Sequence, residues 1–299
     1  MKIDLRMVAV TIVMLLTITL LFNREFGISE RSIVNEKRSI SNCRKWTDDR
    51  AVDDLFGYLP PEPRRLTDCS DLFSGTPEQN FTYSDVYAKM SPDFDNVFAQ
   101  TMALVKPNTL EGGTFSEKAQ HLALHYMASR TNVKTVCETG FNAGHSSFNY
   151  LTANSRVTVH SFDIGWHPYT KAMSTYLQSK FQNRLFVHFG DSTETVPQFR
   201  KENPDVVCDL IFVDGGHNYL AAVSDLLNLA AMANVADGNV IVFDDYPTKW
   251  SFDQEFDQAW ADIICWGYVR EVFRCSSGPD RGFVAGVVVQ RPRVITVDQ

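Results

Sequence analysis

Short apolar segments alternate with longer amphipathic segments over the second half of the chain. Five apolar, β-branched runs have the length of a strand, and the segments between them carry apolar residues at helical spacing. The predicted strands are 135–138, 157–163, 185–190, 209–214 and 239–244, and the predicted helices between them are 146–153, 168–181, 194–201 and 219–234. Such alternation predicts a parallel sheet with helices on both faces.

Two further apolar runs, 268–274 and 282–289, close the pattern. The few residues between them leave no room for a helix, so these runs should pair antiparallel at one edge of the sheet. The predicted fold class is therefore α/β and Rossmann-like, with a mostly parallel seven-stranded sheet, helices on both faces and an antiparallel C-terminal edge hairpin. Two helices are predicted ahead of this region, over 84–106 and 117–129.

The N-terminus has a different pattern. After a short tail, 1–6, residues 7–22 read MVAVTIVMLLTITLLF, an apolar run without a polar face. The run is short for a membrane span, and a cleaved signal peptide or a buried helix are alternatives, but the lack of a cleavage site favours a transmembrane signal anchor. Residues 23–80 are proline-broken and predict an irregular stem, which leaves 81–299 as the folded domain.

An anchor of this kind predicts a single-pass membrane protein. The basic residues on its two sides do not fix its orientation. The sequon Asn80-Phe81-Thr82 favours a domain in the lumen of the endoplasmic reticulum or Golgi.

The net charge and the cysteines indicate which partners and which disulfides to expect. The formal net charge of -8 speaks against nucleic acid as a partner, because phosphate neutralisation needs clustered Lys and Arg. Cys137 and Cys208 lie in strand-like runs and are predicted to be buried thiols. The remaining four cysteines could form disulfides in an oxidising compartment, as Cys43 with Cys69 and Cys265 with Cys275, or could be free.

Every one of the five predicted strands ends in at least one carboxylate. The acids are Glu138, Asp163, Asp191, Asp214 and the pair Asp244-Asp245. Ligands of open α/β sheets bind beyond the carboxyl ends of the strands. A single acid there is often a turn former or a helix cap, but five in series predict a site for hydroxyl groups, a cation or a metal ion, rather than for phosphate.

The first of these strands runs into the sequence VCETGFNAGHSS, residues 136–147, with glycines at 140 and 144. A dinucleotide-binding loop would have glycine where this chain has Asn142 and His145, and no Lys-Ser/Thr pair forms a phosphate loop. With the strand-end acids, the stretch resembles the E-x-G-x-x-x-G-x-S motif of class I S-adenosylmethionine-dependent methyltransferases, over residues 110–290 of the chain.

This resemblance implies S-adenosylmethionine (SAM) as the cofactor and gives each residue a role. Gly140, Asn142 and Gly144 would form the loop around its methionine end, with Glu138 orienting the loop and Ser146 bonding the cofactor carboxylate. Asp163 would bridge the two ribose hydroxyls, and Asp191-Ser192 would read the adenine edge.

Within that family the chain is most similar to the metal-dependent small-molecule O-methyltransferases, the catechol O-methyltransferase-like group. The resemblance places Asp214, Asp244 and Asp245 as ligands of Mg²⁺ or Ca²⁺, which would activate the attacking hydroxyl. A turn at the end of a strand is the alternative for Asp244 and Asp245. His217 stands where catechol-type enzymes carry a lysine base, and it could act as the base beside Asp214, as a metal ligand or as a helix cap.

The expected function is O-methylation of a small hydroxylated molecule. A Golgi-type glycosyltransferase is the alternative suggested by anchor and stem, with Asp93-Phe94-Asp95 as its candidate metal motif, and a non-catalytic methyltransferase-like binding protein is another. His121 and His125 lie four apart and predict helix packing. Trp166, His167 and Tyr169 could flank the adenine or pack on the sheet.

Overall fold

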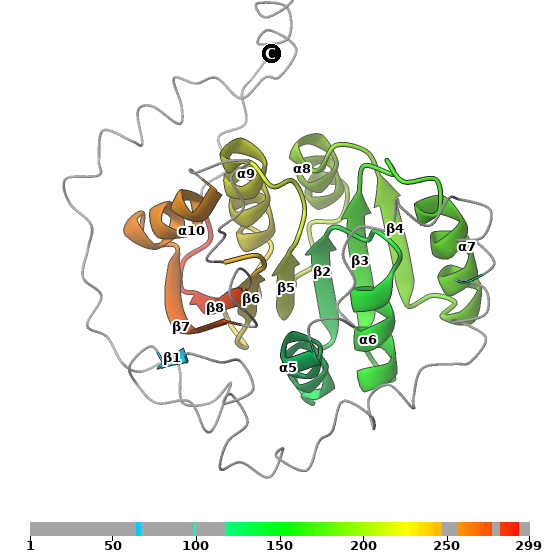
Figure 1. The fold of residues 1–299 in the computed structure, drawn as a ribbon, viewed down its shortest axis with the longest axis horizontal. Helices are drawn as coiled ribbons and strands as arrows, with labels where there is room; N and C mark the ends of the chain where they lie inside the picture. The colour runs from blue at the N-terminus through cyan, green and yellow to red at the C-terminus, as the bar shows by residue number, and fades with distance from the viewer. Residues whose placement is uncertain (1–63, 67–98, 100–117, 247–255, 277–281, 293–299) are drawn as a thin grey trace, which may run out of the picture. The chain divides into compact units, whose positions relative to one another are not determined.

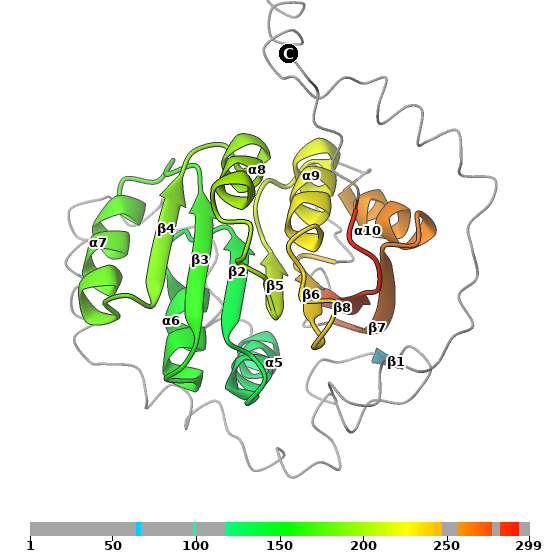
Figure 2. The ribbon, with the colours of Figure 1, turned by 180° about the vertical axis from the view of Figure 1, so that it is seen from behind.

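The computed structural model describes residues 64–66, 99, 118–246, 256–276 and 282–292. These residues form one eight-stranded sheet with helices on both faces (Figures 1 and 2). The strands are β1 (Arg64–Leu66), β2 (Thr135–Thr139), β3 (Thr158–Asp163), β4 (Leu185–Phe189), β5 (Leu210–Val213), β6 (Val240–Phe243), β7 (Val269–Ser276) and β8 (Gly282–Val288), in the order β1-β7-β8-β6-β5-β2-β3-β4.

The five predicted strands of the alternating region form the parallel part of the sheet, β6-β5-β2-β3-β4. Their register aligns the carboxyl ends of the inner strands. Thr139 pairs with Phe162 on one side and with Val213 on the other, and Val213 pairs with Phe243. The strand-end acids that follow these residues therefore lie along a single edge of the sheet.

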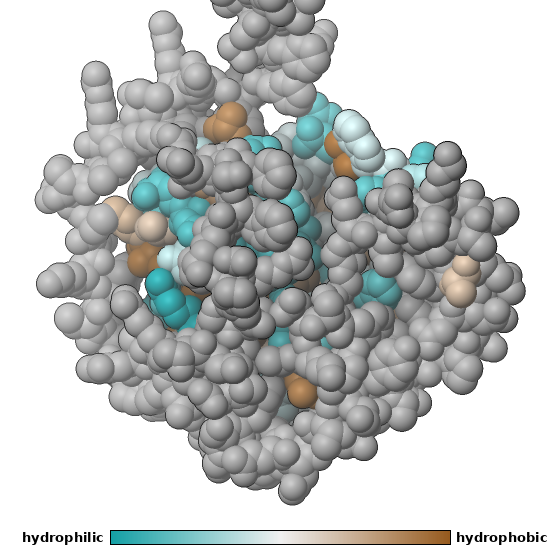
Figure 3. All heavy atoms as spheres, in the orientation of Figure 1, coloured by the Kyte–Doolittle hydropathy of each residue, from teal (hydrophilic) through white to brown (hydrophobic). Residues whose placement is uncertain are grey.

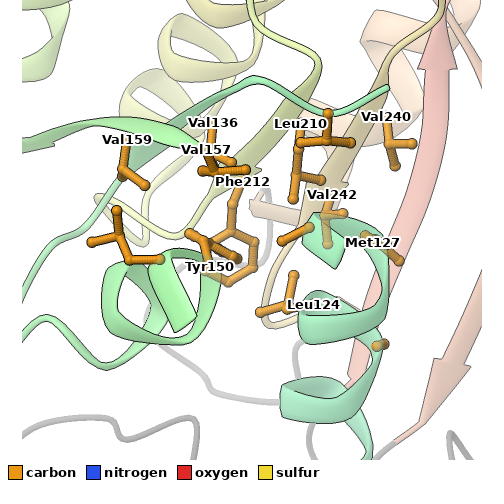
Figure 4. Close-up of a cluster of buried hydrophobic side chains, with 14 of the residues drawn as sticks. Leu124, Met127, Val136, Tyr150, Val157, Val159, Leu210, Phe212, Val240 and Val242 are labelled. Carbon is orange, nitrogen blue, oxygen red and sulfur yellow. The ribbon is translucent and has the colours of Figure 1, made fainter. Parts of the chain in front are cut away.

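Helices α5 (Lys118–Ser129), α6 (His145–Ala153) and α7 (Thr170–Lys180) cover one face, and α8 (Ser192–Glu202), α9 (Tyr219–Ala230) and α10 (Phe256–Cys265) cover the other (Figures 1 and 2). The first face is closed by a core in which Leu124 of α5 and Tyr150 of α6 pack against Val136 and Phe212 of the sheet (Figure 4). All four side chains are fully buried. The apolar side chains of the strands thus hold α5 and α6 against this face of the sheet.

The C-terminal strands pair as predicted, with β8 antiparallel to both β6 and β7. Two features were not predicted. Strand β1, from within the predicted stem, pairs parallel with β7, so the hairpin does not form the edge. Helix α10 lies in a stretch for which no element was predicted, and Phe256, Ala259, Trp260 and Ile263 form its buried face.

The prediction of free thiols at Cys137 and Cys208 is wrong. The two residues form a disulfide between β2 and the residue two places before β5, with a sequence separation of 71 and 5.8 Å between their Cα atoms. Both are fully buried. Cys265 is disulfide-bonded as well. The Cys137–Cys208 bond therefore links β2 to the residues that lead into β5, its neighbour in the sheet.

Removing this disulfide should destabilise the domain. The double substitution Cys137→Ala and Cys208→Ala is expected to lower the free energy of unfolding by about 2–4 kcal/mol, because the bond restricts a long loop of the unfolded chain. Denaturant unfolding of both proteins under oxidising conditions measures the difference. The wild type under reducing conditions is the control, and equal stability of the two proteins would show that the bond does not form.

The predicted membrane location is contradicted by the structure. Among the residues that it describes, no helix is both long enough and apolar enough to cross a bilayer. The expected single-pass protein of the endoplasmic reticulum or Golgi, with the membrane as a partner, is therefore corrected. Residues 7–22, on which the prediction rested, lie outside the described ranges, as do Asn80, residues 93–95 and all but one residue of the predicted helix 84–106.

Candidate active site

The loop between β2 and α6 is shaped by three residues in the left-handed region, namely Gly140, Asn142 and Gly144 with φ values of 92°, 49° and 82°. The amide of Gly140 donates to the carbonyl of Phe162 at 2.9 Å, which ties the loop to the end of β3. At Gly140 a β-carbon would lie 1.8 Å from the carbonyl oxygen of Asp214. This loop, residues 139–145, is called the cofactor loop below, and it packs directly on the backbone that follows β5.

Glu138 lies beneath the cofactor loop and has no exposed surface. Its Oε1 accepts a hydrogen bond from the Ser147 hydroxyl in the first turn of α6. Burial raises the pKa of the Glu138 carboxyl to about 7, although the hydrogen bond from Ser147 counters part of this effect. Glu138 therefore holds the start of α6 against the end of β2.

This buried acid predicts a pH dependence of stability. The carboxyl ionises near pH 4.5 in the unfolded chain but only near pH 7 in the folded one, so the folded state binds the extra proton between these values. The protonated carboxyl therefore adds to the free energy of unfolding below pH 4.5. This contribution, about 3 kcal/mol, is lost as the pH rises through 7.

Glu138→Gln removes this titration. The variant should be more stable than the wild type at pH 8 by up to about 3 kcal/mol and should lose this advantage near pH 4.5. Denaturant unfolding at both pH values measures the change. Glu202→Gln, at the exposed end of α8, is the matched control. A constant difference between variant and wild type across this range would contradict the assignment.

Asp163, at the end of β3, is held by two different loops. Its Oδ2 accepts the backbone N–H of Asn142 at 2.8 Å, and its Oδ1 accepts the backbone N–H of Gly165 at 2.6 Å. A carboxylate oxygen can accept two hydrogen bonds, so each oxygen retains capacity for a ligand hydroxyl. The geometry thus brings Asp163 to the cofactor loop, and two ligand hydroxyls could be bound there.

Asp191 and Ser192 follow β4 at the start of α8. The Asp191 side chain caps this helix, because its Oδ1 accepts from the backbone N–H of Thr193 at 2.9 Å and from the Thr193 hydroxyl at 2.7 Å. The Ser192 hydroxyl lies near Asp225 of α9, a fully buried carboxyl whose pKa is raised to about 6, first by burial. Asp191 therefore has a structural task, whatever it contributes to ligand binding.

Asp214, His217 and Asp245 converge beyond the ends of β5 and β6. Each offers one ligand atom, and these atoms lie within 4.8 Å of one another. The His217 Nε2 lies 3.2 Å from Asp245 Oδ2, and the imidazole is 60% exposed. Two carboxylates and an imidazole at this spacing fit a divalent cation. His217 does not cap α9. The cap is Asn218, whose side-chain oxygen accepts a hydrogen bond from the N–H of Ala221.

Asp244 lies outside this group, although it was predicted as a metal ligand. Its Oδ1 accepts from the side-chain amide of Gln120 at 2.6 Å and from the backbone N–H of Asp245 at 2.8 Å. Burial, followed by the charge of Asp245, raises the pKa of the Asp244 carboxyl to about 7. The neighbouring acids thus differ in surroundings, with Asp244 turned to the α5 side chain and Asp245 to His217.

Two residues of the site were missed or left open in the sequence. Gln120, at the start of α5, had no signal that would link it to Asp244. Tyr169 was predicted either to flank the adenine or to pack on the sheet. It is fully buried, and its hydroxyl donates a hydrogen bond to the side chain of Asn142. His121 and His125 pack between α5 and α6, as predicted, and His125 contacts Asn149.

On the face drawn in Figure 3, the visible atoms of the described residues are mostly hydrophilic, with separate hydrophobic side chains. The most exposed large apolar residues are Trp166, at 78%, and Ile164, at 59%, in the segment after Asp163. An exposed apolar pair beside a carboxylate offers a flat surface next to hydroxyl-binding oxygens. Together with the loop of residues 139–145 and the group of Asp214, His217 and Asp245, the carboxyl ends of the strands could hold a nucleoside-like ligand and a second molecule side by side.

Residues 137–246 match the model of a protein family described as a methyltransferase domain. This range contains the end of β2, the cofactor loop, and every strand-end acid described above. No curated protein sequence matches the chain.

Three solved structures illustrate the likeness of fold. The O-methyltransferase TomG of Streptomyces achromogenes, involved in tomaymycin synthesis and solved with SAM, is 15% identical, with a TM-score of 0.53 over 72% of this chain and 100% of its own. A putative O-methyltransferase of Klebsiella pneumoniae is 15% identical, with a TM-score of 0.51 and coverages of 71% and 98%. The Bacillus cereus O-methyltransferase, solved with S-adenosylhomocysteine (SAH), is 15% identical. Its TM-score is 0.51, over 70% of this chain and 99% of its own.

The identities are low, so these structures show the fold, and the family match adds the domain type. Residues 137–246 thus resemble a methyltransferase domain, and the described part of the chain has the fold of O-methyltransferases of known structure.

Proposed function

We propose that the protein is a SAM-dependent O-methyltransferase that acts on a small hydroxylated molecule with the help of a divalent cation. The observation that supports this most directly is the contact between Gly140 and Asp214, where a β-carbon on the loop would overlap the Asp214 carbonyl. The cofactor loop and the group of Asp214, His217 and Asp245 are therefore contiguous. A methyl donor in the loop would lie beside an acceptor at the acids.

The cofactor site is proposed to consist of Glu138, Gly140, Asn142, Gly144, Ser146, Asp163, Asp191 and Ser192. When bound, SAM supplies an electrophilic methyl group on a sulfonium. The chain contributes the binding and orientation. Glycines at 140 and 144 let the backbone approach a ligand closely, and the Asp163 carboxylate can accept both ribose hydroxyls while it holds the loop amides.

Asp214 and Asp245 are proposed to hold the cation, Mg²⁺ or Ca²⁺, for which carboxylate oxygens are suitable ligands. When bound, the cation would lower the pKa of the acceptor hydroxyl. His217 would accept the proton of that hydroxyl, and the Asp245 carboxylate, 3.2 Å from Nε2, would stabilise the resulting imidazolium. Asp244, with its amide partner Gln120, supports the turn that carries Asp245. Positioning the two reactants supplies most of the rate enhancement.

The direct test is transfer of labelled methyl from SAM to a panel of small acceptors with vicinal hydroxyls, single hydroxyls or amines. The full chain is assayed with Mg²⁺, with Ca²⁺ and with a chelator. We expect transfer to hydroxyl acceptors that depends on the cation. Transfer that persists in chelator would disprove the metal role, and transfer to amines alone would disprove O-methylation.

A further inference from the structure

We propose that Tyr169 is a positioning residue of the cofactor site, which acts through Asn142 to hold the cofactor loop against Asp163. The inference rests on the proposed function. Tyr169 lies directly before α7, and its hydroxyl donates to the Asn142 side-chain oxygen at 2.7 Å. The backbone N–H of Asn142 in turn donates to Asp163 at 2.8 Å. One chain of hydrogen bonds thus connects the start of α7 to the carboxylate proposed to bind ribose.

The conformation of Asn142 explains why the loop needs such a contact. Its φ of 49° is in the left-handed region, which non-glycine residues adopt at a cost in free energy, although asparagine does so more readily than most. This conformation is also what directs the Asn142 N–H to Asp163 while the neighbouring glycines take positive φ values. A hydrogen bond to the side chain offsets the cost and selects this conformation over others that the loop could adopt.

Tyr169 is well placed to supply that bond. Its side chain is fully buried, and its ring stacks on His167 at 5.0 Å with an interplanar angle of 4°. The position of the phenol is therefore set by the fold and does not depend on a ligand. Asp163 receives its second amide from Gly165, four residues before Tyr169, so the segment after β3 supports the carboxylate directly through Gly165 and indirectly through Tyr169 and Asn142.

The test is a double-mutant cycle on the full chain, with SAH affinity measured by calorimetry. Tyr169→Phe removes only the hydroxyl and should weaken SAH binding about tenfold, with little change in thermal stability. Asn142→Gly suits the backbone conformation and removes the acceptor, so it should also weaken binding. In the Asn142→Gly background Tyr169→Phe should have no further effect. Tyr176→Phe is the matched control. Tyr176 lies in α7, the helix that Tyr169 precedes, with its ring against Lys180.

Wild-type affinity in Tyr169→Phe would overturn the proposal, and so would an equal loss from Tyr169→Phe in both backgrounds, because Tyr169 would then act without Asn142. If Tyr169→Phe does not fold, Asn142→Gly tests the link from the loop side, and wild-type affinity in that variant would overturn it. Failure of the wild type itself to bind SAH is a separate outcome, which would refute the proposed function and this inference with it.

Discussion

Gly140→Ala is expected to abolish SAH binding and to lower the free energy of unfolding by more than about 4 kcal/mol. The added β-carbon would lie 1.8 Å from the carbonyl oxygen of Asp214 and 2.7 Å from its carbonyl carbon. Both are backbone atoms at the end of a buried parallel strand, so neither can move aside without displacing β5. The residue must also keep a φ of 92°, which alanine rarely adopts.

Gly238→Ala separates these two causes. Gly238 has a similar φ of 98° but precedes β6, at the opposite end of the strands from the site. Its substitution should cost about 1 kcal/mol through backbone strain and leave SAH affinity unchanged. Calorimetric titration and denaturant unfolding of both variants give the comparison. Wild-type SAH affinity in Gly140→Ala would show that the loop does not pack on Asp214.

The second large effect is expected from His217→Ala, which should reduce the rate of methyl transfer by about 100-fold or more. The substitution removes the proposed proton acceptor and its contact with Asp245. SAH affinity and cation affinity should change little, because Asp214 and Asp245 remain. Transfer rates with the best acceptor of the panel, together with calorimetric titration of Mg²⁺ and of SAH, measure the three quantities.

Asn218→Ala is the neighbouring control. It removes the side-chain cap of α9 and should cost about 1 kcal/mol of stability while leaving transfer largely intact. If His217→Ala loses cation binding together with transfer, His217 is a ligand instead of the base. A wild-type rate in His217→Ala would remove both roles.

The parallel sheet and the edge that carries the acids could be predicted because each strand is a separate apolar run with an acid behind it. The strands β5 and β6, LIFV and VIVF, are buried at every position, and they require no knowledge of distant contacts to be recognised. Helix α10 could have been predicted too, since Phe256, Ala259, Trp260 and Ile263 already have helical spacing in the sequence.

The different surroundings of the residues within the site depend on contacts between segments that are distant in sequence. Asp244 and Asp245 are equivalent in sequence, and they differ because Gln120, 124 residues earlier, reaches only the first. Tyr169 meets Asn142 across 27 residues, and the disulfide partners become neighbours only through the order β5-β2-β3. None of these contacts has a local pattern that would predict it.

The central claim is that the edge formed by the cofactor loop and Asp163 binds SAM. Its most direct test is calorimetric titration of the full chain with SAM and SAH, for the wild type and for Asp163→Ala, with the exposed Asp205→Ala as control. We expect binding by the wild type and the control, and a loss of about 100-fold or more in Asp163→Ala, since two ribose hydrogen bonds to a carboxylate disappear. Undiminished binding by Asp163→Ala, or no binding by the wild type, would contradict the claim.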